Sequence, residues 1–307
     1  MAMVIIENKM QIVKYPDDTS YSIAKRLEQE YTEEGIGMYA NRPRFLNDLT
    51  IRVNTYEQLW HLNQIVDSYN NNGVTPTITI PWLIDGQADR RFESNQSFGL
   101  KLVLKFLNNM KANFKIFHPH NAEVVEALLD NVEIIDNTEF IRHVIHRIDA
   151  ENNYDKRPAI FSCIQTCLTI LSPDAGAYKW SVKILDKLGW TGDLKSASKS
   201  RTLVAETSTL TQQLPLNDFK GKDILVIDDV CIYGGTFKGL ATMLRERNCG
   251  KLYGAFSHIT VQNHEKDSVF NYFDRVFTTN SKYDVYYERV DGSSGKEIKN
   301  LDIIKMF

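Results

Sequence analysis

Residues 223–244 read DILVIDDVCIYGGTFKGLATML, and this stretch decides which fold the sequence predicts. An apolar run leads into two adjacent carboxylates, a Gly-Gly-Thr turn and then apolar residues at helical spacing. A strand followed at once by an amphipathic helix is the repeating unit of parallel sheets with crossover helices. We therefore predict a strand over Ile224–Ile227 and a helix over Phe237–Asn248, with Thr236 as its cap.

The same alternation of short apolar runs and helical stretches continues through the chain, and it predicts the α/β class. The other strands are expected at Leu49–Val53, Thr77–Pro81, Phe114–His118, part of Ala159–Leu171, Leu252–His258 and Arg275–Thr278. Further helices are expected over Thr55–Asn70, Asn95–Met110 and Ala122–Asp130, the last capped by Asn121.

The length of 307 residues favours two domains. A polar stretch at 139–158 interrupts the alternation of strands and helices near the middle of the chain. We therefore place the boundary near residue 145 and expect domains 1–145 and 146–307, each with the same strand-and-helix arrangement. A second irregular stretch, 194–222, has many hydroxyls and few large apolar residues. It predicts a mobile flap, and the alternative is a solvated surface insertion.

Composition excludes several classes of protein. Hydrophobic residues make up 43%, as in an ordinary globular protein. The formal net charge is -3, so the molecule as a whole has no positive electrostatic potential that would bind a nucleic acid, and any phosphate site must be local. The first residues do not resemble a signal peptide, and no run reaches the ~18 apolar residues of a membrane span. Four cysteines without disulfide-like spacing favour a reducing cytoplasm.

The carboxylates and glycines of the opening stretch suit a phosphorylated sugar. At the carboxyl end of a strand, Asp228 and Asp229 would face the crevice where open α/β sheets bind ligands, and they would accept hydrogen bonds from sugar hydroxyls. Gly234 and Gly235 allow the backbone to approach an anion, and the helix that begins at Thr236 favours a phosphate. The alternative is a strand end with a helix cap, but the order of all these parts favours a ribose-phosphate site.

The string VIDDVCIYGGT resembles the ribose-phosphate signature of type I phosphoribosyltransferases and of ribose-phosphate pyrophosphokinases, also called PRPP synthetases. The resemblance implies two phosphoribosyltransferase-like domains, each a mainly parallel sheet flanked by helices. It also implies that the phosphorylated ribose lies on this loop. The implied binding residues are Asp228, Asp229, Ile232, Tyr233, Gly234, Gly235 and Thr236.

Two further motifs resemble the pyrophosphokinases specifically. SPDAGAYKW, residues 172–180, is similar to their SPDxGG loop, and FHPHNAEVV, residues 117–125, is similar to their strand that ends in Asp-Leu-His. The resemblance implies that His120 and Asp174 bind Mg²⁺. From chemistry alone, His120 would be a strand-end histidine, because Mg²⁺ prefers oxygen ligands.

The ATP and flap positions follow from the same resemblance. PWLIDGQADRRF, residues 81–92, matches the family's PYFGYARQDRR segment, which implies that Arg90 and Arg91 bind ATP together with His120. Within the flap, SKSR resembles the Lys-x-Arg pair that closes over the reacting phosphates, so Lys199 and Arg201 are the expected catalytic residues. Solvated charges on a loop are the alternative.

The activity implied by the resemblance is transfer of the β,γ-diphosphate of ATP to the anomeric hydroxyl of ribose 5-phosphate, with release of AMP and formation of PRPP. Mg²⁺ is the implied cofactor and ATP the co-substrate. Positioning and charge neutralisation carry most of the catalysis in phosphoryl transfer. A type I phosphoribosyltransferase that uses PRPP, or a non-catalytic protein associated with synthetases, are the alternatives.

The chain departs from the family pattern at three places. Ile232-Tyr233 replaces the usual Asp-Thr, so we expect either ribose 5-phosphate or a 5'-extended acceptor such as ADP-ribose, which would connect the protein with NAD metabolism rather than general nucleotide biosynthesis. Gln87-Ala88 replaces Arg-Gln beside ATP. Residues 35–47 show no Phe-Ser-Asp-Gly-Glu segment, which the family's hexamer uses, although we still expect a homo-oligomer.

Overall fold

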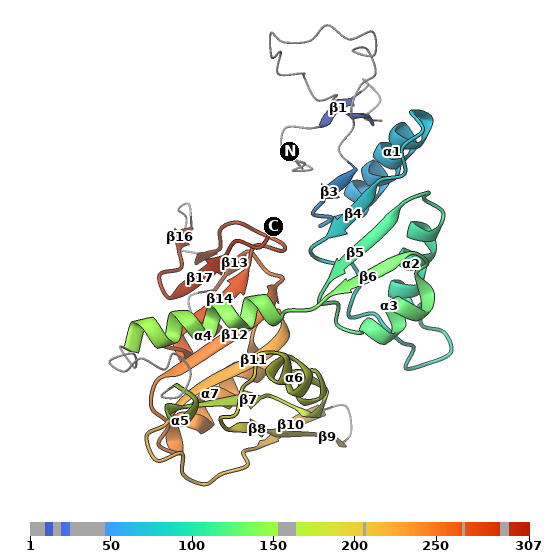
Figure 1. The fold of residues 1–307 in the computed structure, drawn as a ribbon. Helices are drawn as coiled ribbons and strands as arrows, with labels where there is room; N and C mark the ends of the chain where they lie inside the picture. The colour runs from blue at the N-terminus through green and yellow to red at the C-terminus, as the bar shows by residue number, and fades with distance from the viewer. Residues whose placement is uncertain are drawn as a thin grey trace, which may run out of the picture. The chain divides into compact units, whose positions relative to one another are not determined.

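A computed structural model describes residues 10–14, 20–24, 47–152, 164–204, 207–265, 268–288 and 295–307. The chain divides into two compact units, Met1–Ile135 and Asp136–Phe307. Figure 1 colours the first unit blue to green and the second green to red. Each unit has a parallel sheet flanked by helices, which confirms the predicted α/β class.

The first unit contains a four-stranded sheet in the order β3-β4-β5-β6, in which all neighbours are parallel. Its strands are β3 (Asp48–Thr50), β4 (Thr77–Ile80), β5 (Asn113–Phe117) and β6 (Val132–Ile135). The crossover helices are α1 (Tyr56–Asn71), α2 (Gly99–Asn108) and α3 (Ala122–Leu128). A separate antiparallel pair is formed by β1 (Met10–Lys14) and β2 (Ser20–Ala24).

Local sequence explains where the helices of the first unit begin. Thr55 and Gln58 form a capping box at α1, in which each side chain accepts a hydrogen bond from the other residue's backbone N–H. Asn121 caps α3 by accepting from the Val124 N–H at 3.1 Å, as the sequence predicts. These caps fix the loops that leave the carboxyl ends of the strands.

The second unit contains a six-stranded sheet in the order β17-β14-β12-β11-β7-β8, again with all neighbours parallel. Its strands are β7 (Leu168–Ser172), β8 (Leu194–Ser196), β11 (Asp223–Cys231), β12 (Leu252–Ile259), β14 (Arg275–Thr279) and β17 (Leu301–Ile304). Its helices are α4 (Thr138–Asn152), α5 (Ile164–Cys167), α6 (Ala175–Lys187), α7 (Gly235–Glu246) and the short 3-10 helix η1 (Val269–Tyr272).

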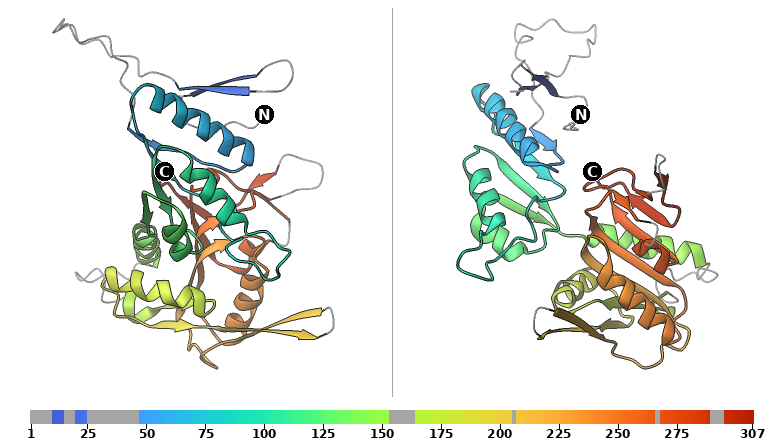
Figure 2. Two further views of the ribbon diagram at one scale, coloured as in Figure 1. Left: turned by 90° about the vertical axis from the view of Figure 1, so that its right-hand side faces the viewer. Right: turned by 180° about the vertical axis from the view of Figure 1, so that it is seen from behind.

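Smaller strands complete this unit. The antiparallel pair β9 (Ser198–Val204) and β10 (Thr207–Gln213) lies between β8 and β11 in sequence, and β13 (Asn263–His264), β15 (Tyr287–Glu288) and β16 (Lys296–Glu297) form a three-stranded sheet. Figure 2 shows the β9–β10 pair extending beside the main sheet.

The central strand β11 is buried on both faces. Ile224 and Val226 pack into the core cluster that contains α7, whereas Leu225 and Ile227 pack into the cluster that contains α4 and α6. A parallel strand covered by helices on both sides is apolar at every position, which explains the unbroken Ile-Leu-Val-Ile run. The first polar side chain after this run is Asp228, at the carboxyl end of the sheet.

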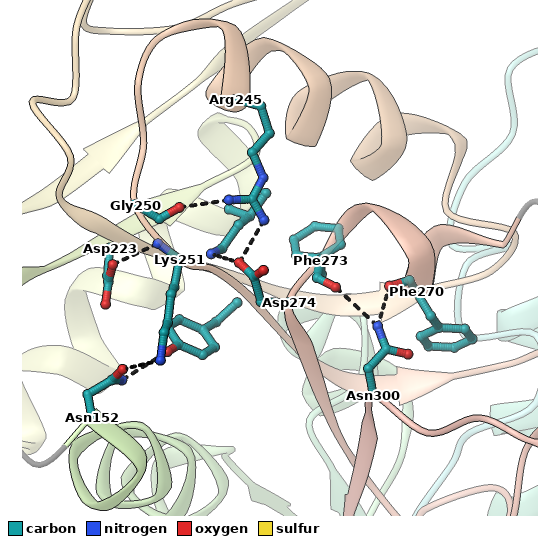
Figure 3. A network of polar contacts seen from close by, with 11 residues as sticks. Asn152, Asp223, Arg245, Gly250, Lys251, Phe270, Phe273, Asp274 and Asn300 are labelled. Carbon is teal, nitrogen blue, oxygen red and sulfur yellow. Dashed lines mark hydrogen bonds and ion pairs between the residues drawn. The ribbon is translucent and has the colours of Figure 1, made fainter.

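The amino edge of the same sheet is closed by polar contacts (Figure 3). At the start of β11, the Asp223 carboxylate accepts the Lys251 N–H at 2.7 Å, and Lys251 Nζ donates to Asn152 Oδ1 at 2.6 Å. At the start of β14, Asp274 pairs with Arg245 at 2.6 Å. The polar side chains at this edge therefore contact one another or the backbone. In open parallel α/β sheets, ligands bind at the opposite, carboxyl edge.

Three expectations need correction. The units divide between Ile135 and Asp136, not near residue 145, because the polar stretch begins with the amphipathic helix α4, whose apolar side is buried. The stretch 194–222 is not irregular, since β8, β9 and β10 occupy most of it. The strand expected within Ala159–Leu171 starts at Leu168, after the helical turn α5; residues 153–163 lie outside the described part.

None of the helices in the described residues is long and apolar enough to cross a membrane. Cys167, Cys231 and Cys249 are free thiols, and Cys163 lies outside the described residues.

Candidate active site

Two adjacent carboxylates stand near the carboxyl end of β11. Asp229 is buried, with 8% of its surface exposed, and Asp228 is half-buried. The Asp229 N–H donates to Asp228 Oδ1 at 2.9 Å, which orients the Asp228 side chain. The sheet therefore presents both carboxyls at the edge where ligands of parallel α/β sheets bind.

The surroundings of Asp228 disfavour its negative charge. Burial raises the pKa of this carboxyl well above its usual range, and the neighbouring Asp229 and Asp174 raise it further. Burial also raises the pKa of the Cys231 thiol, with a second contribution from the charge of Asp228. A ligand that donates hydrogen bonds, or brings positive charge, would relieve this repulsion.

Asp174 comes from the adjacent strand. It follows β7, which pairs with β11, and it is the N-cap of α6, where its Oδ1 accepts the Ala177 N–H at 3.0 Å. Ser172 Oγ donates to the Asp174 carbonyl at 2.6 Å and fixes the turn. Asp174 therefore lies near enough to Asp228 for its negative charge to contribute to the raised pKa of the Asp228 carboxyl.

The loop after β11 turns sharply into α7. Ile232 and Tyr233 are exposed, at 39% and 72% of their surface, and Gly234 has a φ of +76°. Gly234 is the N-cap and Gly235 the first helical residue, so Thr236 lies inside the helix and the prediction that it caps α7 is wrong. The backbone N–H groups of a helix's first turn point out of the helix end, where they can bind an anion.

Gly234 is required for two reasons. Its left-handed backbone is costly for any residue with a Cβ, and a Cβ placed there would lie 2.3 Å from the Cβ of Val269. Val269 is buried at the start of η1, which packs against α7. Gly235 has open space around the position of its missing Cβ.

The neighbouring strand ends form a buried polar edge. His258 Nδ1 lies 2.9 Å from Ser281 Oγ, and Thr279 Oγ1 donates to the Ser257 carbonyl at 2.7 Å. The Thr260 N–H donates to the Cys231 carbonyl at 3.1 Å. The segments SHIT and FTTNS therefore hold the end of β11, and most of their side chains are buried.

In the first unit, the expected ATP residues gather at the carboxyl ends of β4 and β5. Arg90, Arg91 and His120 are all exposed. Asp89, which is 7% exposed, lies 3.3 Å from Arg90 Nε and accepts the Asn121 side-chain N–H at 2.7 Å. Asn121 directly follows His120, so Asp89 connects the arginine segment to the histidine loop.

The residues predicted for the flap and for the metal complete the set of predicted site residues. Lys199 and Arg201 lie on β9, where Lys199 is opposite Gln212 and Arg201 opposite Leu210, but their side chains are outside the described part of the chain. His120 and Asp174 belong to different units. Among the described residues, no three His, Cys, Asp or Glu side chains form a ready metal cage.

Comparison with known proteins gives the family. The model of the phosphoribosyl transferase domain matches residues 129–288, just over half of the chain and most of the second unit. The chain belongs to the phosphoribosyl transferase domain family. Within that family domain lie the carboxylates of β11, the loop and the start of α7.

The curated relatives are ribose-phosphate pyrophosphokinases. That of Sulfolobus acidocaldarius is 24% identical over 282 residues, covering 91% of this chain and 85% of the relative, and that of Sulfurisphaera tokodaii is 22% identical over 303 residues, covering 96% and 84%. The crystal structure of phosphoribosylpyrophosphate synthetase from Mycobacterium smegmatis is 14% identical, has a TM-score of 0.66, and covers 99% of this chain and 87% of that one. The chain is therefore a divergent PRPP synthetase-like protein, and the predictions of that resemblance and of a related transferase enzyme are confirmed.

Sequence reasoning missed two parts of this phosphoribosyl transferase domain. The helix α6 buries Ala177, Ser181, Ile184 and Leu185, and this spacing of three to four residues could have predicted it. The contact of Val269 with Gly234 joins positions 35 apart in the sequence, and no local pattern marks it.

The glycine pair of the loop gives a matched test. We predict that Gly234→Ala lowers the free energy of unfolding by at least about 2 kcal/mol, because it adds left-handed strain and a clash with Val269. Gly235→Ala makes the same chemical change in open space at a helical position, and we expect it to alter stability by less than about 1 kcal/mol. Denaturant unfolding measures both; equal losses would contradict the account.

The raised pKa of Asp228 predicts a pH dependence. The folded protein keeps this proton at pH values where the unfolded chain has released it, so the contribution of Asp228 to stability is fully present below the ordinary Asp pKa. This contribution falls as pH rises toward the raised pKa, by at most about 1.4 kcal/mol per pH unit for one proton. Asp228→Asn keeps an oxygen for the Asp229 N–H and should remove this slope and stabilise the protein at pH 8. Unfolding between pH 4 and 8 measures it; parallel curves for the two proteins would contradict the assignment.

Proposed function

We propose that the chain is an ATP-dependent pyrophosphokinase that transfers the β,γ-diphosphate of ATP to the anomeric hydroxyl of a 5'-phosphorylated ribose. The anomeric oxygen bonds to the β-phosphorus, the bond from that phosphorus to the α,β-bridging oxygen breaks, AMP leaves with the bridging oxygen, and the hydroxyl proton passes to solvent. The observation that carries the proposal is the adjacent pair of the half-buried Asp228 and the buried Asp229, followed by the left-handed Gly234 at a helix start.

The second unit supplies the acceptor half of the site. Carboxylates accept hydrogen bonds from the ribose hydroxyls, which would relieve the repulsion around Asp228. The N–H groups of Gly234, Gly235 and Thr236 lie at the start of α7, where the helix dipole favours a phosphate. These two groups of contacts would fix both ends of the sugar and so orient its anomeric hydroxyl.

The first unit and the flap would supply the donor half. Arg90 and Arg91 are exposed cations, and Asp89 contacts both Arg90 and Asn121, the residue that follows His120. Lys199 and Arg201 lie on the β9–β10 pair and would bind the transferring and departing phosphates. Fixed cations at these positions neutralise the charge that develops during transfer, the main source of catalysis in this chemistry.

Mg²⁺ is the proposed cofactor, and it would neutralise the phosphate charge. Asp174 fits the role of ligand because its side chain supplies hard oxygens, of which Oδ1 also caps α6. Asp228 is a further carboxyl nearby, because the charges of both Asp174 and Asp229 raise its pKa. His120 is proposed as the second ligand by the family resemblance, although nitrogen is a less usual partner for Mg²⁺.

The acceptor is proposed to be ribose 5-phosphate, giving PRPP, or a 5'-extended ribose such as ADP-ribose, giving ADP-ribose pyrophosphate. Tyr233 is 72% exposed beside the phosphate turn, and Ile232 is 39% exposed. An exposed aromatic ring offers a contact surface for a group beyond the 5'-phosphate. Nucleotide biosynthesis fits the first acceptor and NAD metabolism the second.

Two alternatives are outcomes of the same assay. A type I phosphoribosyltransferase would consume PRPP in a base-dependent reaction, and a non-catalytic protein associated with synthetases would show neither reaction. Similarity to pyrophosphokinases over 91% of the chain favours the kinase. A homo-oligomer and a cytoplasmic location stay predictions, and most of the segment 35–47 lies outside the described residues.

The acceptor can be tested by exchange of two residues. With ATP, Mg²⁺ and either sugar, we expect AMP release and a product heavier than the acceptor by one diphosphate, detected by mass spectrometry. If Tyr233 contacts a 5' extension, the double variant Ile232→Asp, Tyr233→Thr should lower kcat/KM for ADP-ribose at least about tenfold relative to ribose 5-phosphate. Lys238→Ala on α7, whose ammonium lies over the Tyr272 ring, is a control that leaves this ratio unchanged. Wild-type turnover of ribose 5-phosphate alone would exclude the extended acceptor.

A further inference from the structure

Phe92 has the most exposed of the large apolar side chains in the described part of the chain, at 81% of its surface. It lies in the segment between β4 and α2, where its N–H donates to Gln96 Oε1 at 3.0 Å. A single exposed apolar residue is ordinary. Phe92 differs because its neighbours hold it in a definite arrangement beside two cationic residues.

One face of the Phe92 ring is occupied. The guanidinium of Arg90 lies over it, with Cζ 5.7 Å from the ring centroid, which is the geometry of a cation–π contact. Arg90 is held in turn by the buried Asp89 at 3.3 Å, and Asp89 accepts from Asn121 at 2.7 Å. A chain of contacts therefore runs from the start of α3 to the ring.

The rest of the ring faces solvent, next to Arg91 and within the same connected segment as Arg90. A flat apolar surface beside cations suits a ligand that is planar at one end and anionic at the other. A nucleotide has both parts, because every nucleobase has a π face and the phosphates are anionic. An aliphatic phosphate would leave the ring unused.

We propose that Phe92 is the stacking surface for the nucleobase of the nucleotide donor, with Arg90 packed behind the ring and Arg91 available for the phosphates. This inference rests on the proposed function, because it assigns the base of its donor to a position in the first unit. It also accounts for how the donor can be held although Gln87-Ala88 replaces a cation at this site.

The test separates the base from the phosphates. ATP and tripolyphosphate, each with Mg²⁺, are titrated calorimetrically into full-length wild type, Phe92→Ala and Phe92→Trp. Base stacking on an aromatic ring predicts that Phe92→Ala weakens ATP binding by about five- to tenfold and leaves tripolyphosphate within about twofold. Phe92→Trp should bind ATP at least as tightly as wild type. Leu102→Ala, at a position 61% exposed on α2, is the matched control and should change neither ligand.

Each other outcome overturns the assignment. Unchanged ATP affinity in Phe92→Ala, or equal losses for ATP and tripolyphosphate, would show that the ring does not bind the base. An altered sedimentation coefficient with unchanged ATP affinity would place Phe92 in a contact between copies. Wild type that binds no ATP would overturn both proposals. If Phe92 controls ATP binding but no ribose yields AMP, the stacking assignment holds and the proposed transfer fails.

Discussion

The burial of β11 between two layers of helices is the constraint on which the rest of the site depends. A parallel strand covered by helices on both faces has apolar side chains where it is buried, so after the run Ile224–Ile227 the next carboxylates, Asp228 and Asp229, come near its carboxyl end. There Asp228 and Asp229 are still partly desolvated, which raises the pKa of Asp228. The fold thus keeps two mutually repelling carboxyls at one edge, where a hydroxyl-rich or cationic ligand would stabilise them.

A second constraint is the path of the chain into α7. The left-handed Gly234 lets the backbone turn within a few residues, and Val269 fills the space that any side chain would need. This contact makes η1 a support for the loop, because Val269 of η1 lies against Gly234, one of the residues expected from the sequence to bind ribose. Ile232 and Tyr233 are the exposed part of this otherwise tightly packed turn.

Much of this could be predicted from the sequence, for local reasons. The apolar run of β11, the Asp pair and the glycines are adjacent in the chain, so strand, carboxylates and turn follow from periodicity and from the need for a positive φ. The boundary near residue 145 was wrong because polar residues on the outer side of α4 conceal its buried side. The helix cap was misplaced because Gly234 and Gly235 can each adopt the turn. The link from Asp89 to Asn121 joins residues 32 apart, and no local pattern encodes it.

The proposed function requires a ribose phosphate to bind on the turn between β11 and α7. Amide hydrogen exchange of the full-length protein, with and without saturating ribose 5-phosphate, tests it most directly at the level of single peptides. The account predicts slower exchange at the amides of residues 233–237, because their N–H groups bind the phosphate. It predicts no change at the amino edge, around Asp223, Lys251 and Asp274. Protection absent from 233–237, with bound ligand protecting other segments instead, would contradict the account.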